Sequence, residues 1–390
     1  MRGLAYLAMR HALRRWGRSL VLVLSVAVAL ALPATSRVLV ARYDEALHAR
    51  GATTPLVVGA KGSRFDLVFA ALYYRSADIG TTTVGRYEWL LRESGVEAVP
   101  VHARFTVRGS VPVVATTLEY FERRGLQVDA GRRPALLSEC VLGAAVARRL
   151  GLGVGDELFS DQRRALDITS AQSIRLPVVG VLAETGTPDD EAVFVDLETA
   201  WVLEGATHGH TPAERVRGEG LVIGESDGHI ALANALREAQ EITPENASDF
   251  HLHGERRDLP LTAVLVWPDS DKTRTIVGER VNRSDADQAV VPTRVIDDLM
   301  AFVVRVRTVF DALAVVLLAS TAVLIGLIVA LSYRVREAEL RTLGEIGASR
   351  FAVAQLFGLE LAGLVGVALV VAAGLVGASV AIVTSVVTLV

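Results

Sequence analysis

The sequence predicts an α-helical membrane protein with a large α/β extracytoplasmic domain inserted between its first and second transmembrane helices. Hydrophobic residues make up 51% of the 390 residues, and the mean hydropathy of +0.39 is high for a soluble protein. Three segments are apolar for long enough to cross a bilayer, which needs about 20 such residues per helix. Residues 37–307, between the first two segments, alternate β-rich and helical runs instead.

The first apolar segment, residues 19–36, is predicted to be a membrane helix that follows a cytoplasmic N-terminus, residues 1–18. No acidic residue precedes it, and arginine-rich ends stay on the cytoplasmic side. The alternative is a cleaved signal peptide, because residues 29–31 resemble a cleavage site. The apolar run outlasts the usual signal-peptide core of about 7 to 15 residues and continues as a helical pattern towards His48, which favours a membrane helix. The basic residues of this start are Arg2, Arg10, Arg14, Arg15 and Arg18.

Residues 308–333 and 357–390 are the second and third predicted transmembrane helices. The second returns the chain to the cytoplasm, and the arginines of residues 334–356 agree with that side. The third is either one long helix or a helix broken near Gly374 and Gly377. The sequence therefore predicts a multi-pass membrane protein with its N-terminus in the cytoplasm and its large domain on the other side.

Composition excludes several other classes. The net charge of -4 and the scattered basic residues give no reason to expect a nucleic-acid partner. Cys140 is the single cysteine, so the chain has neither an internal disulfide nor a two-cysteine metal motif.

The outer segment reads as an α/β domain. Alternation predicts strands over residues 54–60, 96–109, 111–117, 176–183, 192–197, 262–268 and 288–292. Helical spacing predicts helices over residues 64–74, 141–151, 229–241 and 293–313, the last running without Gly or Pro into the second membrane segment. Residues 204–228 and 247–258 are richer in glycine, histidine and charge and are expected to form loops or a small subdomain.

The segment between the second and third membrane helices is predicted to form a short amphipathic helix at the cytoplasmic membrane surface. Leu340, Leu343 and Ile346 recur at helical spacing, with charged residues on the other faces. Gly347 suits the end of this helix and Ser349 the cap of the next one.

These residues carry a resemblance. The run "RVREAELRTLGEIGASRFAVAQLFGLE" resembles the segment that follows the second membrane helix in the MacB/LolC/FtsX family of ABC-transporter permeases, the type VII or mechanotransmission class. Residues 137–158 and 176–200 are similar to the outer domain of these permeases. The resemblance implies that the membrane is a bacterial inner membrane and that residues 37–307 form a MacB-like periplasmic domain with stalk helices.

By this resemblance the chain is a permease subunit that couples ATP hydrolysis by a separate cytoplasmic ABC ATPase to movement of its periplasmic domain, for export or envelope mechanotransmission. The family implies a second permease copy, in a homodimer or heterodimer, and allows a periplasmic adaptor. The alternative for the cytoplasmic helix is a solvated surface with no partner. The residues that the resemblance assigns to ATPase coupling are Arg336, Glu337, Leu340, Leu343, Gly344, Gly347, Ala348 and Ser349.

The chain itself is not expected to be an enzyme, and no catalytic residue is assigned. No run matches the phosphate-binding pattern G-x-x-x-x-G-K-[ST], so ATP is expected in the partner subunit. The nearest run, "VGAKGSRFD", reads as a turn with Ser63 or Gly62 near a helix cap. Family members have four membrane helices, so we expect a truncated chain, a three-helix variant or a separately encoded fourth helix.

Two His-x-His pairs suggest a divalent-metal site. His208 with His210, and His251 with His253, each place two imidazoles on one side of an extended strand, which suits Zn²⁺. Glu204, Asp249 and Glu255 lie nearby in sequence and could complete the site. The alternative function is therefore a membrane-tethered extracytoplasmic sensor or a divalent-metal-binding or metal-handling protein.

A third, weaker hypothesis is a membrane-anchored hydrolase. "TGTPDDE" clusters three carboxylates, but between two strands it reads as a turn with Pro188 fixing φ. No G-x-S-x-G elbow occurs, and Cys140 has no base partner in its sequence neighbourhood.

Overall fold

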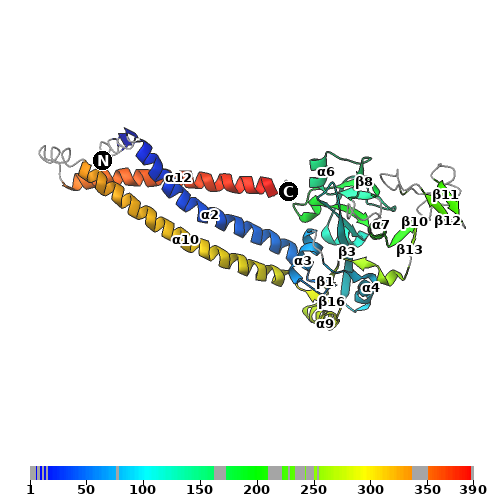
Figure 1. Ribbon diagram of the computed structural model, residues 1–390. Helices are drawn as coiled ribbons and strands as arrows, with labels where there is room; N and C mark the ends of the chain where they lie inside the picture. Colours follow the sequence, from blue (N-terminus) through cyan, green and yellow to red (C-terminus); the bar gives the residue numbers. More distant parts are fainter. Residues whose placement is uncertain are drawn as a thin grey trace. The chain divides into compact units, whose positions relative to one another are not determined.

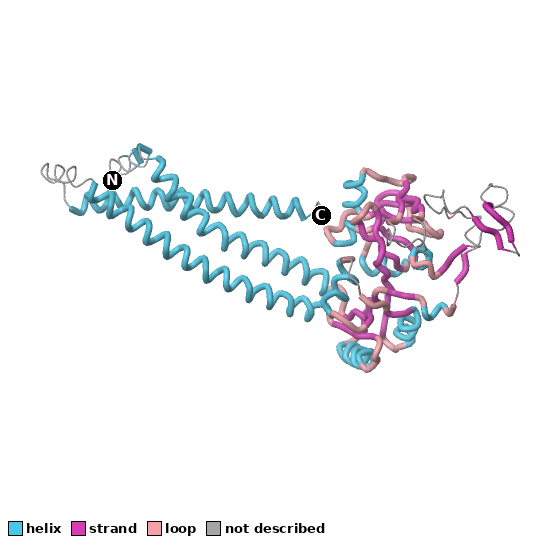
Figure 2. The backbone as a smooth tube through the Cα atoms, viewed as in Figure 1, coloured by secondary structure: helices cyan, strands magenta, loops and turns pink. Residues whose placement is uncertain are grey.

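The computed structural model describes residues 16–75, 79–161, 173–209, 222–226, 229–232, 250–252, 254–335 and 350–387, with a few single positions besides. The chain divides into two compact units. Unit 1 comprises Met1–Ala46 and Asp298–Val390, and unit 2 comprises Leu47–Asp297. Figure 2 shows the long helices of the first unit and the strands of the second.

Unit 1 is built from three long helices, parts of α2 (Trp16–Ala52), α10 (Pro292–Val335) and α12 (Arg350–Val387) (Figure 1). By length and composition each is able to cross a membrane, with candidate spans at Ser19–Ala52, Pro292–Leu327 and Gly358–Val383. Gly374 and Gly377 do not interrupt α12, because four residues of regular helix on either side carry the hydrogen-bond ladder past them.

Helices α2 and α12 pack through small side chains. Ala27 and Ala31 of α2 form a buried cluster with Ala368 and Ala372 of α12. Each pair is four residues apart, so both alanines of a pair lie on one helix face and allow close backbone approach, as is common between membrane helices.

Helix α10 touches α2 at a charged position. Arg37 of α2 donates to Asp311 of α10 over 3.1 Å, and Arg307 lies 3.7 Å from the same carboxylate. The rest of the α10 apolar face is largely exposed within the part of the chain that the structure describes, Phe302, Val309 and Leu313 among it.

Unit 2 is organised around one ten-stranded sheet in the order β16-β1-β15-β3-β4-β9-β6-β8-β5, with β7 paired to β8. Most neighbouring strands are antiparallel, whereas β4–β9 and β6–β8 are parallel. The strands are β1 (Leu56–Ala60), β3 (Val96–Val107), β4 (Val111–Thr116), β5 (Val128–Gly131), β6 (Cys140–Leu142), β7 (Glu157–Phe159), β8 (Arg175–Leu182), β9 (Val193–Asp196), β15 (Ala263–Pro268) and β16 (Asp287–Val290).

Smaller elements complete unit 2. Three two-stranded pairs are β2 (Thr82–Thr83) with β14 (Pro260–Leu261), β10 (Thr207–Gly209) with β13 (Phe250–Leu252), and β11 (Val222–Ser226) with β12 (His229–Leu232). The helices are α3 (Arg64–Tyr73), α4 (Val84–Arg92), α5 (Leu118–Arg124), α6 (Ala144–Leu150), α7 (Leu197–Leu203) and α9 (Asp271–Asn282), with the 3₁₀ turns η1 (Pro188–Glu191) and η3 (Arg256–Asp258).

Local sequence explains where these helices begin. Ser63 caps α3 by accepting from the backbone N–H of Asp66, which confirms the turn predicted for "VGAKGSRFD". Asp196 caps α7 and Ser270 caps α9 in the same way. Each cap satisfies one of the backbone N–H groups that a helix start leaves without an internal partner.

The core of unit 2 is aliphatic at the centre of the sheet and aromatic beneath α5. The four residues of β15 from Ala263 to Val266 are fully buried. Phe194 of β9 lies between Tyr120 and Phe121 of α5, with ring centroids 5.8 and 5.5 Å away. The middle of α5 is thereby packed against β9 of the sheet.

Two helix predictions were wrong, one in part, over the residues that can be compared. The helix predicted over residues 141–151 begins only at Ala144, because Val141 and Leu142 belong to β6. Residues 229–241 were predicted as a helix, but His229–Leu232 form β12 and pair with β11. The local helical pattern of four residues is too short to outweigh a hairpin that gives their backbone groups cross-strand partners. Residues 233–241 lie outside the described part of the chain.

Candidate functional site at the end of α2

The last turns of α2, residues 47–52, belong to unit 2 and bring an arginine into its interior. Arg50 is 6% exposed and forms a two-pronged ion pair with Asp189 of η1, which is 1% exposed. Nη1 donates to Oδ2 over 2.7 Å and Nη2 donates to Oδ1 over 2.8 Å. This parallel geometry is the strongest form of the arginine–carboxylate contact.

Two tyrosines complete the buried cluster. Nη2 of Arg50 also donates to the hydroxyls of Tyr74 and Tyr120, over 3.1 and 2.9 Å. The Tyr120 hydroxyl donates to Oδ1 of Asp189 over 2.7 Å, and the Tyr74 hydroxyl contacts both that oxygen and Tyr120. Nε of Arg50 donates to the Leu72 carbonyl over 3.2 Å, so all three guanidinium nitrogens have partners.

The backbone conformation at the end of α3 and in η1 directs the side chains of Tyr74 and Asp189 towards Arg50. Tyr74 ends α3 in the left-handed region at φ 56, which turns its side chain into the core. In η1, Thr187 is the cap and Pro188 opens the turn. A non-glycine residue in the left-handed region is uncommon, and the four-residue cluster is what holds Tyr74 there.

The carboxylates of "TGTPDDE" have separate structural partners. Asp190 accepts from the backbone N–H groups of Thr185 and Gly186, over 3.0 and 2.7 Å, which closes the turn. Asp189 faces Arg50 instead. The predicted turn is confirmed, and the two aspartates are engaged by different partners.

Electrostatics keeps the cluster as one positive and one negative charge. Burial raises the pKa of Asp189, but Arg50 and the hydrogen bonds from the tyrosine hydroxyls outweigh it and hold the pKa below the ordinary 3.8. Burial raises the pKa of Tyr74 and of Tyr120 above the ordinary 10.0. At neutral pH Asp189 is therefore ionised and both phenols are protonated.

A second ring of contacts holds the residues that follow Arg50. Arg124 of α5 donates to the hydroxyls of Thr53 and, over 2.8 Å, of Thr54. Nε1 of Trp267 donates to the Thr53 carbonyl over 2.8 Å, and the Arg124 guanidinium lies 5.7 Å from the Trp267 ring centre. The exit from α2 is thus fixed by β15 and α5 together.

The start of α10 meets the end of α2 inside unit 2. Nε2 of His48 lies 2.9 Å from Oδ1 of Asp297. Gly51 faces Ile296 so closely that an added Cβ would come within 2.5 Å of Cδ1 of Ile296. A side chain at this position would require the end of the Ile296 side chain to shift, so the glycine favours close packing of the two helix ends.

The predicted coupling residues lie outside the described residues. They are Arg336, Glu337, Leu340, Leu343, Gly344, Gly347, Ala348 and Ser349. Their role as an ATPase contact stays a prediction.

The backbone brings one histidine from each predicted metal pair into register. His208 of β10 is the direct cross-strand partner of His251 in β13, whereas His210, His253 and Asp249 lie outside the described residues. Glu204 bonds His102, its Oε1 lying 3.2 Å from Nε2. Across the described residues, no group of three or more His, Cys, Asp or Glu side chains is arranged to hold a metal ion.

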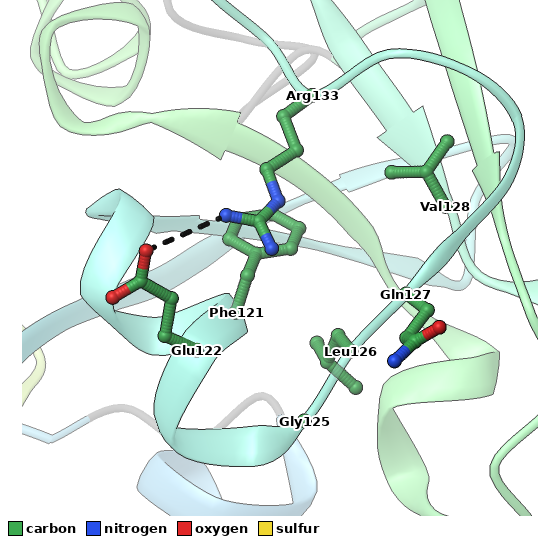
Figure 3. A pocket seen from close by; sticks show the side chains of 7 residues that line it. All are labelled: Phe121, Glu122, Gly125, Leu126, Gln127, Val128 and Arg133. Atoms are coloured by element: carbon green, nitrogen blue, oxygen red, sulfur yellow. Dashed lines mark ion pairs between the residues drawn. The ribbon is translucent and has the colours of Figure 1, made fainter.

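Two further features carry no chemistry of their own. Cys140 is buried, and burial raises the pKa of its thiol, which keeps it protonated. A shallow depression of about 460 Å³ lies beside α5 (Figure 3). The guanidinium of Arg133 lies 5.6 Å from the centre of the Phe121 ring and 3.8 Å from the Glu122 carboxylate. Among the described residues, the one cationic side chain that lines the depression is therefore already paired.

Comparison with known proteins identifies the domain. The family model of the MacB-like periplasmic core domain matches residues 20–218, which is just over half of the chain. The chain belongs to this family. The MacB-like match begins within α2 and includes Arg50, Tyr74, Tyr120 and Asp189.

Solved structures include distant likenesses to this MacB-like domain. The periplasmic region of MacB from Actinobacillus actinomycetemcomitans is 9% identical, with a TM-score of 0.35, and the alignment covers 64% of this chain and 94% of that one. The extracellular domain of the noncanonic ABC-type transporter YknZ from Gram-positive bacteria is 12% identical, with a TM-score of 0.33, covering 60% and 98%. No curated protein sequence matches the chain as a relative.

Proposed function

We propose that this chain is the permease subunit of an ABC transporter, in which ATP hydrolysis by a separate ATPase moves the MacB-like domain. The observation that carries the proposal is the junction at the end of α2. One helix contains a candidate membrane span and ends in a buried ion pair inside unit 2. A movement of that helix in the bilayer would therefore act directly on the interior of unit 2.

The rest of the junction supports this role. A domain that only binds a ligand needs no more than a flexible tether to its membrane helix. Here the residues after Arg50 are fixed by Arg124 and Trp267, and Gly51 packs against α10. Two membrane helices with such firmly held ends suit the transmission of force.

The finer parts of the proposal follow from the sequence. The N-terminus and residues 334–356 lie in the cytoplasm, the membrane is the bacterial inner membrane, and unit 2 is periplasmic between the first two spans. The cytoplasmic segment contacts the ATPase through the eight coupling residues named above. A second permease copy completes the complex, and a periplasmic adaptor is compatible with it.

Co-purification with the ATPase encoded beside this chain tests the function. Leu340→Asp with Leu343→Asp should reduce ATPase recovery at least tenfold, because two charges would enter an apolar contact face. The matched control is Leu91→Asp with Leu118→Asp, two leucines about half exposed in unit 2, which should leave recovery unchanged. Failure of the unaltered chain to bring down any ATPase would refute the assignment.

One observation favours a second candidate, a membrane-tethered sensor or divalent-metal-binding protein. The pairing of His208 with His251 places one histidine of each predicted pair at adjacent backbone positions. In that case the full-length chain should bind Zn²⁺ tightly, and replacing both histidines by alanine should weaken binding at least tenfold, since imidazoles would be lost as ligands. Isothermal titration of ZnCl₂ into the unaltered chain, the double His→Ala variant and the control variant His229→Ala measures this affinity. Equal affinity of all three proteins would remove this candidate.

A further inference from the structure

We propose that the Arg50–Asp189 pair is a positioning element that fixes the rotation of α2 about its axis within unit 2. Movement of the membrane helices is then transmitted both to the half of the sheet that contains β1 and to the half that contains β8 and β9. The inference rests on the proposed function for its purpose. Its geometry rests on unit 2 alone, because all the residues that carry it lie between Leu47 and Asp297.

Stability is a poor explanation for this ion pair. Removing two charges from water is costly, and replacing a buried ion pair by apolar residues of similar volume often leaves a protein equally or more stable. Apolar contacts, however, have little directional preference. Arg50 makes five hydrogen bonds from three nitrogens in a planar group, to the Leu72 carbonyl, Asp189, Tyr74 and Tyr120. A rotation of α2 would lengthen or misalign several of these bonds together.

The partners of Arg50 come from different connections between strands of the sheet. Asp189 lies in the connection between β8 and β9, and Tyr120 lies in α5 between β4 and β5. The chain itself leaves α2 for β1, which is next to the opposite edge of the sheet. Without the ion pair, a pull on α2 would reach β1 through residues 53–55, β15 through Trp267 and α5 through Arg124. With it, the same pull also reaches the half of the sheet that contains β8 and β9.

The neighbouring contacts prevent the helix end from turning on a flexible exit. Arg124 and Trp267 hold Thr53, and the Tyr73 hydroxyl donates to the Leu47 carbonyl over 2.8 Å. These bonds involve backbone carbonyls or hydroxyls at the helix end and do not select a helix face. Arg50 does select a face, as do His48 beside Asp297 and Gly51 against Ile296. Of these three residues, Arg50 is the one that reaches Asp189 and Tyr120.

The test uses the full-length chain with spin labels at Ala49→Cys in α2 and Asp129→Cys in β5, both exposed. Cys140 is buried and needs no replacement. Electron–electron double resonance should give a narrow distance distribution for the unaltered pair. Arg50→Met with Asp189→Leu should keep the melting temperature within a few degrees and at least double the width of the distribution. A narrow distribution in this folded double variant would overturn the proposal.

Two controls separate rotation from general damage. Arg86→Met with Asp287→Leu removes another ion pair of unit 2, with a 2.7 Å contact between groups 20% and 8% exposed, that joins α4 to β16 and leaves α2 untouched. It should not broaden the distribution. If the Arg50→Met double variant does not fold, Arg50→Lys keeps the charge and loses the planar fork; it should broaden the distribution, and a narrow one would again overturn the proposal.

A second measurement tests whether the fixed rotation of α2 is needed for ATP-driven movement of unit 2. With the ATPase bound, the distance between Asp129→Cys labels on two copies of the chain should change on addition of ATP. In the Arg50→Met double variant, ATP hydrolysis should continue while this change falls by at least half. If the unaltered chain binds no ATPase, the proposed function fails, yet the width measured on the chain alone still decides the role of Arg50.

Discussion

At the residue scale, a two-pronged ion pair between two buried groups, Arg50 and Asp189, holds the end of α2 within unit 2. Arg50 and Asp189 are held by two phenols that remain protonated at neutral pH. Because the charges are buried, removing one partner leaves the other without compensation, which typically costs about 3–5 kcal/mol. A single substitution is therefore expected to destabilise unit 2, whereas the paired apolar replacement should leave its stability nearly unchanged.

Asp189→Asn should lower the free energy of unfolding of unit 2 at neutral pH. In acid the variant and the unaltered chain should become similarly stable. The pKa of Asp189 in the folded chain lies below the ordinary 3.8, so its stabilisation is complete above that value and is lost as the pH falls towards the folded pKa. The difference in free energy of unfolding between the two proteins should be unchanged above about pH 5 and should shrink as the pH falls below about 4. Tryptophan fluorescence reports mainly on unit 2, since Trp89, Trp201 and Trp267 lie there and Trp16 alone does not. A difference that stays constant with pH would contradict the assignment of charge.

At the scale of elements, α2 serves two packing environments along one helix. Its first half packs through Ala27 and Ala31 against α12, and its last turns lie in the hydrogen-bonded interior of unit 2. Small residues suit the first because they let helices approach within lipid, where no hydrophobic force draws them together. Directional polar groups suit the interior of unit 2 because their hydrogen bonds fix the rotation of α2 about its axis.

Ala27→Leu should weaken the contact between α2 and α12. Ala27 is 0% exposed, and added methylenes in a filled contact typically cost about 1–3 kcal/mol. A disulfide between Ala31→Cys and Ala372→Cys should therefore form several-fold less efficiently in this variant. Val28→Leu, on the exposed side of the same turn, should leave its formation unchanged. Equal cross-linking in both variants would show that the alanine cluster does not determine helix packing.

At the scale of the whole molecule, much of the architecture could be predicted from hydrophobic pattern. All seven predicted strands correspond to strands of the main sheet, because each has four or more residues with alternating or continuous apolar character. Strands β5, β6 and β7 were missed, since three or four residues such as "CVL" or "ELF" are too short to show a period. Their pairing is set by neighbouring strands instead.

The candidate site was not predicted, for a different physical reason. Arg50 ends a run of charged residues on a helix, and charged residues in that position usually lie on a solvated face. Its partners Tyr74, Tyr120 and Asp189 are 24, 70 and 139 residues away. Only the tertiary fold brings them together, although the acidic "TPDD" turn was recognised as a turn.

The close approach of Gly51 to Ile296 has a further consequence, for how such a chain can change over evolution. The first and last residues of unit 2 adjoin each other, with His48 beside Asp297. A domain whose ends meet can be exchanged for another, or for a short turn, without altering the path of the two helices that carry it. Unit 2 is thus inserted between α2 and α10 through two adjoining ends, so another domain with adjoining ends could take its place.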